Sequence, residues 1–305
     1  MLLEGDNLAA MTALHQRSRG AFTLVYLDPP FLTGRQHAKV LRTRDRRTGQ
    51  LVRAEQLAFD DRWDGLDEYL TALRARIVVA RRLLARHGSL VVHVDTKTSH
   101  YVKVMCDEIF GLDCFASEIV WRYRRWPSRT RNFQRLHDVL LRYVRDPDAP
   151  TRFNQLYEPL AASTLATWGD RKQRAVVDAS GRRCRSSSTE DPTPGTPLGD
   201  VWDIGIVAPV ARERTGYPTQ KPEALLRRLV EACTDPDDLV LDPYAGSGTT
   251  LAVCAGLGRR VVGIDSSPEA LRTIRRRLRD RGIRPLQERV VLPDEWEESE
   301  TALAG

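Results

Sequence analysis

The chain has 305 residues, 41% of them hydrophobic and 29% charged, which is typical of a soluble globular protein with one large or two modest domains. No apolar run reaches the roughly 20 residues of a membrane-spanning helix, and no basic leader precedes an apolar stretch, so we expect a cytoplasmic protein with no membrane partner. The net charge of +6 favours a phosphate-bearing partner such as nucleic acid, although a coding bias towards arginine produces the same charge.

The five cysteines are scattered along the chain, without a CxxC pair and without partnered histidines. This distribution argues against a structural zinc site and against a disulfide framework. We therefore expect buried, inert thiols and no bound metal.

Apolar runs alternate with amphipathic segments along the first half of the chain. Between 33 and 56 the composition turns polar and basic, which predicts a loop. The predicted elements of this half are a helix at 5–17, a strand at 21–28, a helix at 66–88 stopped by Gly88, a strand at 89–95, a helix at 99–110, and strands at 117–125 and 137–146.

Regular periodicity is lost over 146–198, where Pro, Ser, Thr and Gly gather, and we expect a small loop-rich insertion there. The second half then resumes with a helix at 221–234, a strand, turn and helix start at 238–250, a strand at 259–265, a helix over 266–280 and an acidic tail.

The alternation of strands and helices predicts an α/β fold with a doubly wound, mostly parallel sheet. Ligands of such sheets bind beyond the carboxyl ends of the strands, at the switch point of the winding. Asp28 and Asp242 each end an apolar run, so we expect both carboxylates to face one crevice.

Two turns follow these acidic strand ends. "LVYLDPPF" (24–31) ends in a rigid Asp-Pro-Pro-Phe sequence, which is also a reasonable ordinary turn because proline fixes φ. In "LVLDPYAGSGTT" (239–250), Gly246 and Gly248 allow close backbone approach to a ligand. No Lys-Ser/Thr pair follows the last glycine, so this turn is not a phosphate-cradling P-loop.

The next strand ends at Asp265, 23 residues beyond Asp242. Such spacing is typical of a carboxylate that binds the ribose hydroxyls of a nucleoside. A structural alternative is compatible with it, in which Ser267 caps a helix that begins at Pro268.

The order of these motifs resembles the β-class amino-methyltransferases of DNA. The resemblance rests on "DPPF" (28–31), "YPTQKPEALL" (217–226) and "DPYAGSGTT" (242–250), and it spans nearly the whole chain apart from 146–198 and the tail. Weaker matches are "AFDDRW" (58–63), "GSLVVHVD" (88–95), "EIVWRYRR" (118–125) and "GDVWDIG" (199–205).

This resemblance implies a Rossmann-like class I methyltransferase fold in circularly permuted motif order, with the catalytic motif before the cofactor motif. The chain then divides into a catalytic half at 1–145, a variable insertion and candidate target-recognition region at 146–198, a cofactor-binding half at 199–285 and a tail at 286–305.

The resemblance also implies S-adenosylmethionine as cofactor, and it implies where the cofactor binds. Asp265 would meet the ribose, Thr219 and Lys221 the methionine end, and Asp6 the adenosine moiety, although a helix N-cap explains Asp6 equally well. The cofactor turn would supply Asp242, Tyr244, Gly246, Gly248 and Thr249.

Catalysis is implied for the Asp-Pro-Pro-Phe turn. Asp28 and the carbonyl of Pro29 would accept hydrogen bonds from the exocyclic amine, which is otherwise a poor nucleophile. Pro29 and Pro30 would hold those acceptors rigidly, and Phe31 would stack on the flipped base. Asp-Pro-Pro-Phe resembles the adenine enzymes more than those that methylate the cytosine amine. No cysteine follows a proline, which argues against methylation of a cytosine ring carbon.

Arginines and aromatic residues interleave over 121–137, which is typical of a groove that follows a phosphate backbone, although a solvated edge strand has the same pattern. The DNA-binding candidates are Arg35, Arg122, Arg124, Arg125, Arg129, Arg131, Arg182 and Arg183.

The expected partners are double-stranded DNA, a second copy of the chain in a homodimer, and a cognate restriction endonuclease. The alternatives that remain open are methylation of the cytosine amine, methylation of RNA, and a catalytically silent DNA-binding protein of the same fold.

Overall fold

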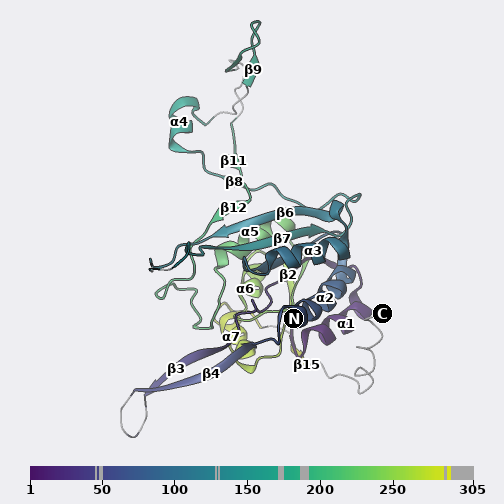
Figure 1. Ribbon diagram of the computed structural model, residues 1–305, viewed down its shortest axis with the longest axis vertical. Coiled ribbons are helices and arrows are strands. Elements are labelled where there is room, and N and C mark those ends of the chain that lie inside the picture. Colours follow the sequence, from purple (N-terminus) through teal and green to yellow (C-terminus); the bar gives the residue numbers. More distant parts are fainter. Residues whose placement is uncertain are drawn as a thin grey trace. The chain divides into compact units, whose positions relative to one another are not determined.

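The computed structural model describes residues 1–44, 47, 51–127, 129, 131–170, 175–185, 192–284 and 287–289 (Figure 1). The chain separates into two compact units. The larger unit combines Met1–Phe153 with the chain from Asp200 onward, and the smaller unit is Asn154–Gly199. The smaller unit overlaps the insertion predicted at 146–198.

The larger unit is built on a central sheet that has nine strands among the described residues, in the order β12-β6-β7-β5-β2-β13-β14-β1-β15. Neighbouring strands run parallel, except that β7 is antiparallel to both β5 and β6. The strands are β1 (Leu2–Glu4), β2 (Phe22–Leu27), β5 (Leu84–Val94), β6 (Phe115–Arg122), β7 (His137–Val144), β12 (Val201–Asp203), β13 (Leu239–Asp242), β14 (Arg260–Asp265) and β15 (Gln287–Arg289).

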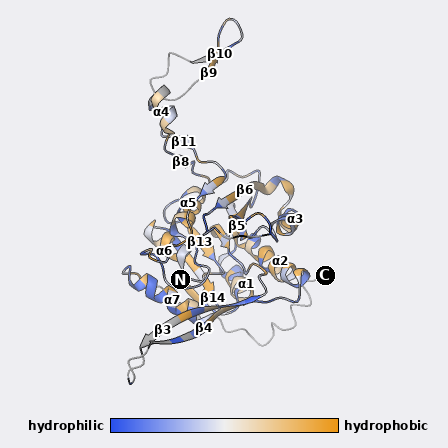
Figure 2. Ribbon diagram, turned by 60° about the vertical axis from the view of Figure 1, so that its left-hand side comes forward, coloured by the Kyte–Doolittle hydropathy of each residue, from blue (hydrophilic) through white to orange (hydrophobic). Residues whose placement is uncertain are grey.

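Helices cover both faces of this sheet, with α1 to α3 on one side and α5 to α7 on the other (Figure 2). All six residues of β2 are buried, as expected for a strand with both faces covered. The doubly wound fold predicted from the sequence is confirmed. The helices are α1 (Asn7–Ser18), α2 (Leu66–Leu83), α3 (Ser99–Phe110), α5 (Glu223–Cys233), α6 (Thr249–Gly256) and α7 (Pro268–Arg279), with a short 3-10 turn η1 at Leu112–Cys114. None of the described helices is long and apolar enough to cross a membrane.

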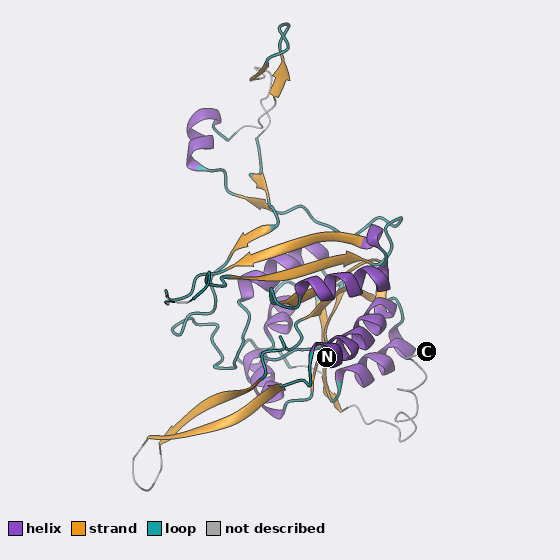
Figure 3. Ribbon diagram, viewed as in Figure 1, coloured by secondary structure: helices purple, strands orange, loops and turns teal. Residues whose placement is uncertain are grey.

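The predicted loop at 33–56 is wrong, because a long β-hairpin occupies this segment (Figure 3). Its strands are β3 (Arg35–Arg44) and β4 (Leu51–Asp61), which pair antiparallel. The hairpin is anchored by Lys39, whose buried ammonium lies 2.5 Å from Glu269 of α7. A contact across 230 residues of sequence leaves no signal in the local composition.

The predicted helix at 66–88 is also corrected. The helix ends at Leu83, and β5 begins directly at Leu84. Gly88 therefore does not stop a helix. A Cβ at this position would lie 2.8 Å from the carbonyl oxygen of Phe22, so the glycine allows β5 to lie against β2.

The predicted tail at 286–305 starts too early, because Gln287–Arg289 forms β15 beside β1. The rest of that tail lies outside the described residues. The smaller unit contains β8 (Tyr157–Glu158) paired with β11 (Thr196–Pro197), β9 (Ala175–Val177) paired with β10 (Arg183–Arg185), and helix α4 (Ala162–Trp168).

Candidate active site

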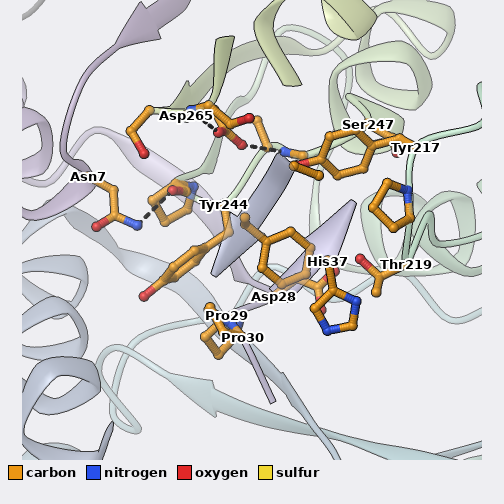
Figure 4. A pocket seen from close by; sticks show the side chains of 18 of the residues that line it. Asn7, Asp28, Pro29, Pro30, His37, Tyr217, Thr219, Tyr244, Ser247 and Asp265 are labelled. Carbon is orange, nitrogen blue, oxygen red and sulfur yellow. Dashed lines mark hydrogen bonds between the residues drawn. The ribbon is translucent and has the colours of Figure 1, made fainter. Parts of the chain in front are cut away.

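A cavity of about 490 Å³ lies at the carboxyl ends of β2, β13 and β14 (Figure 4). Asp28 lines it directly after β2, and Asp242 and Asp265 line it at the ends of β13 and β14. The two acidic strand ends therefore share one crevice, as the sequence predicted. The strands that carry them are neighbours in the sheet, although Asp28 and Asp242 are far apart in sequence.

The turn after β13 is held by backbone N–H groups that donate to carboxylates. The N–H of Tyr244 donates to Asp242 at 3.0 Å, and the N–H of Gly246 donates to Asp265 at 2.8 Å. Gly248 has φ +73 and precedes α6, where an added Cβ would lie 2.9 Å from the side chain of Ile274. Gly248 is not among the residues that line the cavity. The lack of a side chain at this position instead allows the positive φ of the turn and the close packing of α7.

Burial governs the acid–base state of this turn. It raises the pKa of Asp242 to about 7, and it also raises the pKa of Asp265. Asp265 accepts a second backbone hydrogen bond, from the N–H of Ser267 at 2.8 Å. Ser267 caps α7 by accepting from Ala270, and Pro268 is the first residue of that helix. Both predictions made for this segment, the cavity-facing acid and the helix cap, are compatible in one geometry.

The remaining cofactor candidates also reach the cavity, namely Asp6, Thr219, Lys221, Tyr244 and Thr249. Asp6 caps α1 by accepting from the N–H of Ala9, and its other oxygen accepts from Arg76 at 3.1 Å. Thr219 has φ +57, a left-handed conformation that is uncommon for a threonine.

Lys221 occupies a place that the sequence did not predict. Its Nζ lies 2.6 Å from both carboxylate oxygens of Asp28 and 4.8 Å from the centroid of the Phe31 ring. The predicted contact with the methionine end of a cofactor stays a prediction. The structure adds a contact between this lysine and the carboxylate of Asp28 in the Asp-Pro-Pro-Phe turn.

A buried histidine lies against the Asp-Pro-Pro-Phe turn and was missed in the sequence. Nδ1 of His93, in β5, forms a hydrogen bond of 2.8 Å with the hydroxyl of Tyr26. The same nitrogen lies 3.7 Å from the carboxylate of Asp28. Its Nε2 lies 3.4 Å from Asp138 of β7. Burial raises the pKa of Asp138, but the contacts with His93, Lys221 and Tyr123 together outweigh burial, and the net direction is downward. The motif "GSLVVHVD" contains this histidine, but its pattern is that of an ordinary buried strand.

A second residue missed in the sequence is Asp61, the last residue of β4. It also lines the cavity, beside the Asp-Pro-Pro-Phe turn. The motif "AFDDRW" contains it, but two adjacent aspartates near a hairpin end give no local sign of which one turns inward.

The DNA-binding candidates are distributed over three parts of the chain. Arg122 at the end of β6 pairs with Asp203, whereas Arg35 at the start of β3 is exposed. The loop between β6 and β7 exposes Arg124, Arg125, Arg129 and Arg131. In the smaller unit Arg182 is exposed, and the side chain of Arg183 lies outside the described residues.

A doubly wound sheet with acidic strand ends, a glycine turn and one shared cavity is the arrangement of a Rossmann-like protein that binds a nucleoside. A family model described as DNA methylase matches residues 22–276. This match covers most of the chain, and the protein belongs to that DNA methylase family.

Curated relatives match most of the chain. It is 27% identical over 278 residues to the DNA adenine methyltransferase YhdJ of Escherichia coli strain K12, a match that covers 91% of this chain and 82% of the relative. It is 29% identical over 323 residues to the type II methyltransferase M.EcaI of Enterobacter cloacae, covering 89% and 68%.

Solved structures share the fold at lower identity. The M1.HpyAVI–SAM complex superposes with a TM-score of 0.57 at 19% identity, covering 91% of this chain and 98% of that one. The cytosine-N4-specific PvuII DNA methyltransferase superposes with a TM-score of 0.56 at 15% identity, covering 99% and 90%.

Proposed function

We propose that this protein transfers a methyl group from S-adenosylmethionine to the exocyclic amino group of adenine in DNA, after the base is flipped out of the duplex. The observation that carries the proposal is the cavity shared by Asp28 of the Asp-Pro-Pro-Phe turn and Asp242 of the glycine turn. The relative named as an adenine methyltransferase supports adenine as the target.

The residues of the cavity fit the cofactor. A volume of about 490 Å³ lies in the range of small-molecule and cofactor sites. Asp265 ends β14 where a ribose-binding acid is expected, and Gly246 with φ +49 brings its backbone close to the cavity. The cofactor supplies an activated methyl carbon on a sulfonium, which requires no metal.

The catalytic turn supplies the groups that act on the base. Asp28 accepts a hydrogen bond from the exocyclic amine, and the carbonyl of Pro29 accepts the other. Together they favour a lone pair that points at the methyl carbon. Asp28 is also placed to take the proton that the nitrogen loses when the new carbon–nitrogen bond forms. Lys221 holds this carboxylate through both oxygens, so that it stays aimed into the cavity.

The loop between β6 and β7 supplies contacts with the DNA. It leaves the sheet after Arg122 and returns at His137, two residues that pair across the strands. Trp126 is 92% exposed and Phe133 is 98% exposed, between the exposed arginines of the same loop. We assign the arginines to phosphates and the two aromatic rings to stacking on bases.

The partners beyond DNA stay predictions. A homodimer is tested by light scattering of the purified chain, and a cognate restriction endonuclease by examining the neighbouring genes. A cytoplasmic location likewise stays a prediction.

The test is to incubate the purified protein with labelled S-adenosylmethionine and DNA, and to identify the modified nucleoside. We expect N6-methyladenine. N4-methylcytosine would instead establish the cytosine alternative, and DNA binding without transfer would establish the silent binding protein.

The variant Asp28→Ala tests the role proposed for the Asp-Pro-Pro-Phe turn in methyl transfer. We expect transfer to be abolished, because the amine loses its acceptor, while the dissociation constant for S-adenosylmethionine stays within about threefold. Unchanged transfer would rule out the role given to Asp28.

A further inference from the structure

Asp61 is a buried carboxylate that faces the catalytic turn from the base of the β3–β4 hairpin. Its side chain is 1% exposed. It neighbours Asp60, which points outward, is 40% exposed and binds Arg62 and Gln36. Both acids line the cavity, but only Asp61 is buried, and the two side chains have different partners.

Five hydrogen-bond donors converge on Asp61. The backbone N–H groups of Phe31, Leu32 and Thr33 donate to it at 3.2, 2.9 and 2.9 Å. The hydroxyl of Thr33 donates at 2.6 Å, and the indole N–H of Trp63 donates at 3.1 Å. Three successive N–H groups aimed at one anion form a backbone arrangement that binds carboxylates.

The backbone that Asp61 binds is in an unfavourable conformation. Leu32 has φ +52, a left-handed conformation that is unfavourable for a residue with a Cβ. A charged acceptor for three N–H groups offsets this cost, because hydrogen bonds to ionised groups are stronger than neutral ones. The shape of the turn at 31–33 therefore depends on a residue about 30 positions later in the chain.

We propose that Asp61 is the positioning residue of the catalytic turn. By holding residues 31–33 it fixes the Phe31 ring, and it fixes the direction in which Asp28 and the Pro29 carbonyl meet the base. This inference rests on the proposed function of the same cavity.

The β3–β4 hairpin holds Asp61 itself in place. The carbonyl of Asp61 accepts from the N–H of Gly34 at 3.0 Å, which closes the base of the hairpin. Further along, Lys39 is locked to Glu269 and Thr273 of α7, the helix that follows Asp265. The hairpin thus joins the catalytic turn to the helix that begins at the cofactor end of the site.

The test compares Asp61→Asn with the control Asp67→Asn, at an exposed aspartate of α2 that is not among the residues lining the cavity. Asparagine keeps the size of the side chain, but it removes the charge and directs an N–H₂ group at donors. We expect Asp61→Asn to lower kcat by about 10- to 100-fold, the equivalent of losing charge-assisted hydrogen bonds. The dissociation constant for S-adenosylmethionine and the KM for DNA should stay within about threefold, because neither depends on the orientation of residues 31–33. Asp67→Asn should leave all three parameters within about twofold, since it changes only an exposed side chain.

A second variant covers the case in which Asp61→Asn does not fold. Thr33→Val removes the hydroxyl bond to Asp61 and the exposed one to His37, but it keeps the three backbone bonds to Asp61. We expect a smaller loss of kcat, about three- to tenfold, with cofactor affinity kept. The proposal is overturned if Thr33→Val leaves kcat unchanged, or if a folded Asp61→Asn loses cofactor affinity as much as kcat. A wild-type protein that transfers no methyl group would instead refute the proposed function, so the two failures can be told apart.

Discussion

At the scale of single residues, the placement of Lys221 changes what this lysine is expected to do. Its ammonium bridges both oxygens of Asp28, and the sequence had suggested a contact with the cofactor carboxylate instead. The two roles differ in the kinetic parameter that each one controls, so that a single substitution separates them.

We expect Lys221→Gln to lower kcat about 10- to 100-fold, because Asp28 loses a charged hydrogen-bond partner. The dissociation constant for S-adenosylmethionine, measured by calorimetry, should change by less than about threefold. Lys97→Gln, at an exposed lysine, is the control. Weak cofactor binding with kcat preserved would restore the role suggested by the sequence.

Asp242 gives the cofactor-free protein a pH-dependent stability. Burial raises the pKa of this carboxyl to about 7, so the folded state holds its proton at pH values where the unfolded chain has lost it. The resulting stability is present at low pH and is lost as pH rises towards and through 7. Asp242→Asn removes the titration and keeps a neutral side chain.

We expect the Tm of Asp242→Asn, minus that of the wild type, to increase from pH 5 to pH 8 in thermal unfolding without cofactor. The increase follows because only the wild type must ionise the buried carboxyl of Asp242 over this interval, whereas Asp265 is present in both proteins. A difference in Tm that does not change with pH would contradict the raised pKa.

At the scale of elements, the loop between β6 and β7 combines charge with exposed rings. Its arginines belong to the electrostatic part of DNA affinity, which depends on salt. Trp126 and Phe133 belong to the part that depends on unpaired bases. These two contributions can be measured separately on the same loop.

We expect the double variant Arg129→Ala/Arg131→Ala to weaken DNA binding and to lower the slope of log K against log salt by about one for each phosphate that is no longer neutralised. Arg17→Ala, at an exposed arginine of α1, should leave that slope unchanged. Trp126→Ala should keep the slope, but reduce methylation of a paired target more than of a target opposite a mismatch. An equal reduction on both targets would argue against base stacking by Trp126.

The elements themselves differ in how far the sequence predicted them. Helix α3 has the predicted bounds, and α6 and α7 begin at the predicted residues, because capping and periodicity act within one or two turns. The β3–β4 hairpin was missed because its stability depends on α7. The end of α2 was missed because Gly88 is required by the close approach of β2, and not by the end of a helix in its own segment.

At the scale of the whole molecule, the smaller unit can be separated from the larger one. Its entrance and exit lie together, since Tyr157 pairs with Pro197 and the N–H of Leu198 donates to the carbonyl of Leu156 at 2.8 Å. Replacing 158–196 by the turn-forming dipeptide Asn-Gly would therefore close the chain without strain.

We expect this deletion to stay folded and to bind S-adenosylmethionine with unchanged affinity, because the cavity is lined by the larger unit alone. Methylation at a defined sequence should be lost, because the smaller unit is the candidate target-recognition region. Sequencing of methylated DNA measures this, and retained sequence specificity would place recognition elsewhere in the chain.

The sequence by itself determined the fold class, the two acidic strand ends and the glycine turn, because each depends on patterns within a dozen residues of chain. The tertiary structure alone decided which groups surround Asp28. Lys221 precedes α5, His93 lies in β5 and Asp61 ends β4, and only the tertiary fold brings the three to the turn that begins at Asp28. Hydrogen bonds act over about 3 Å, so partners remote in sequence stay undetermined until the backbone has placed them.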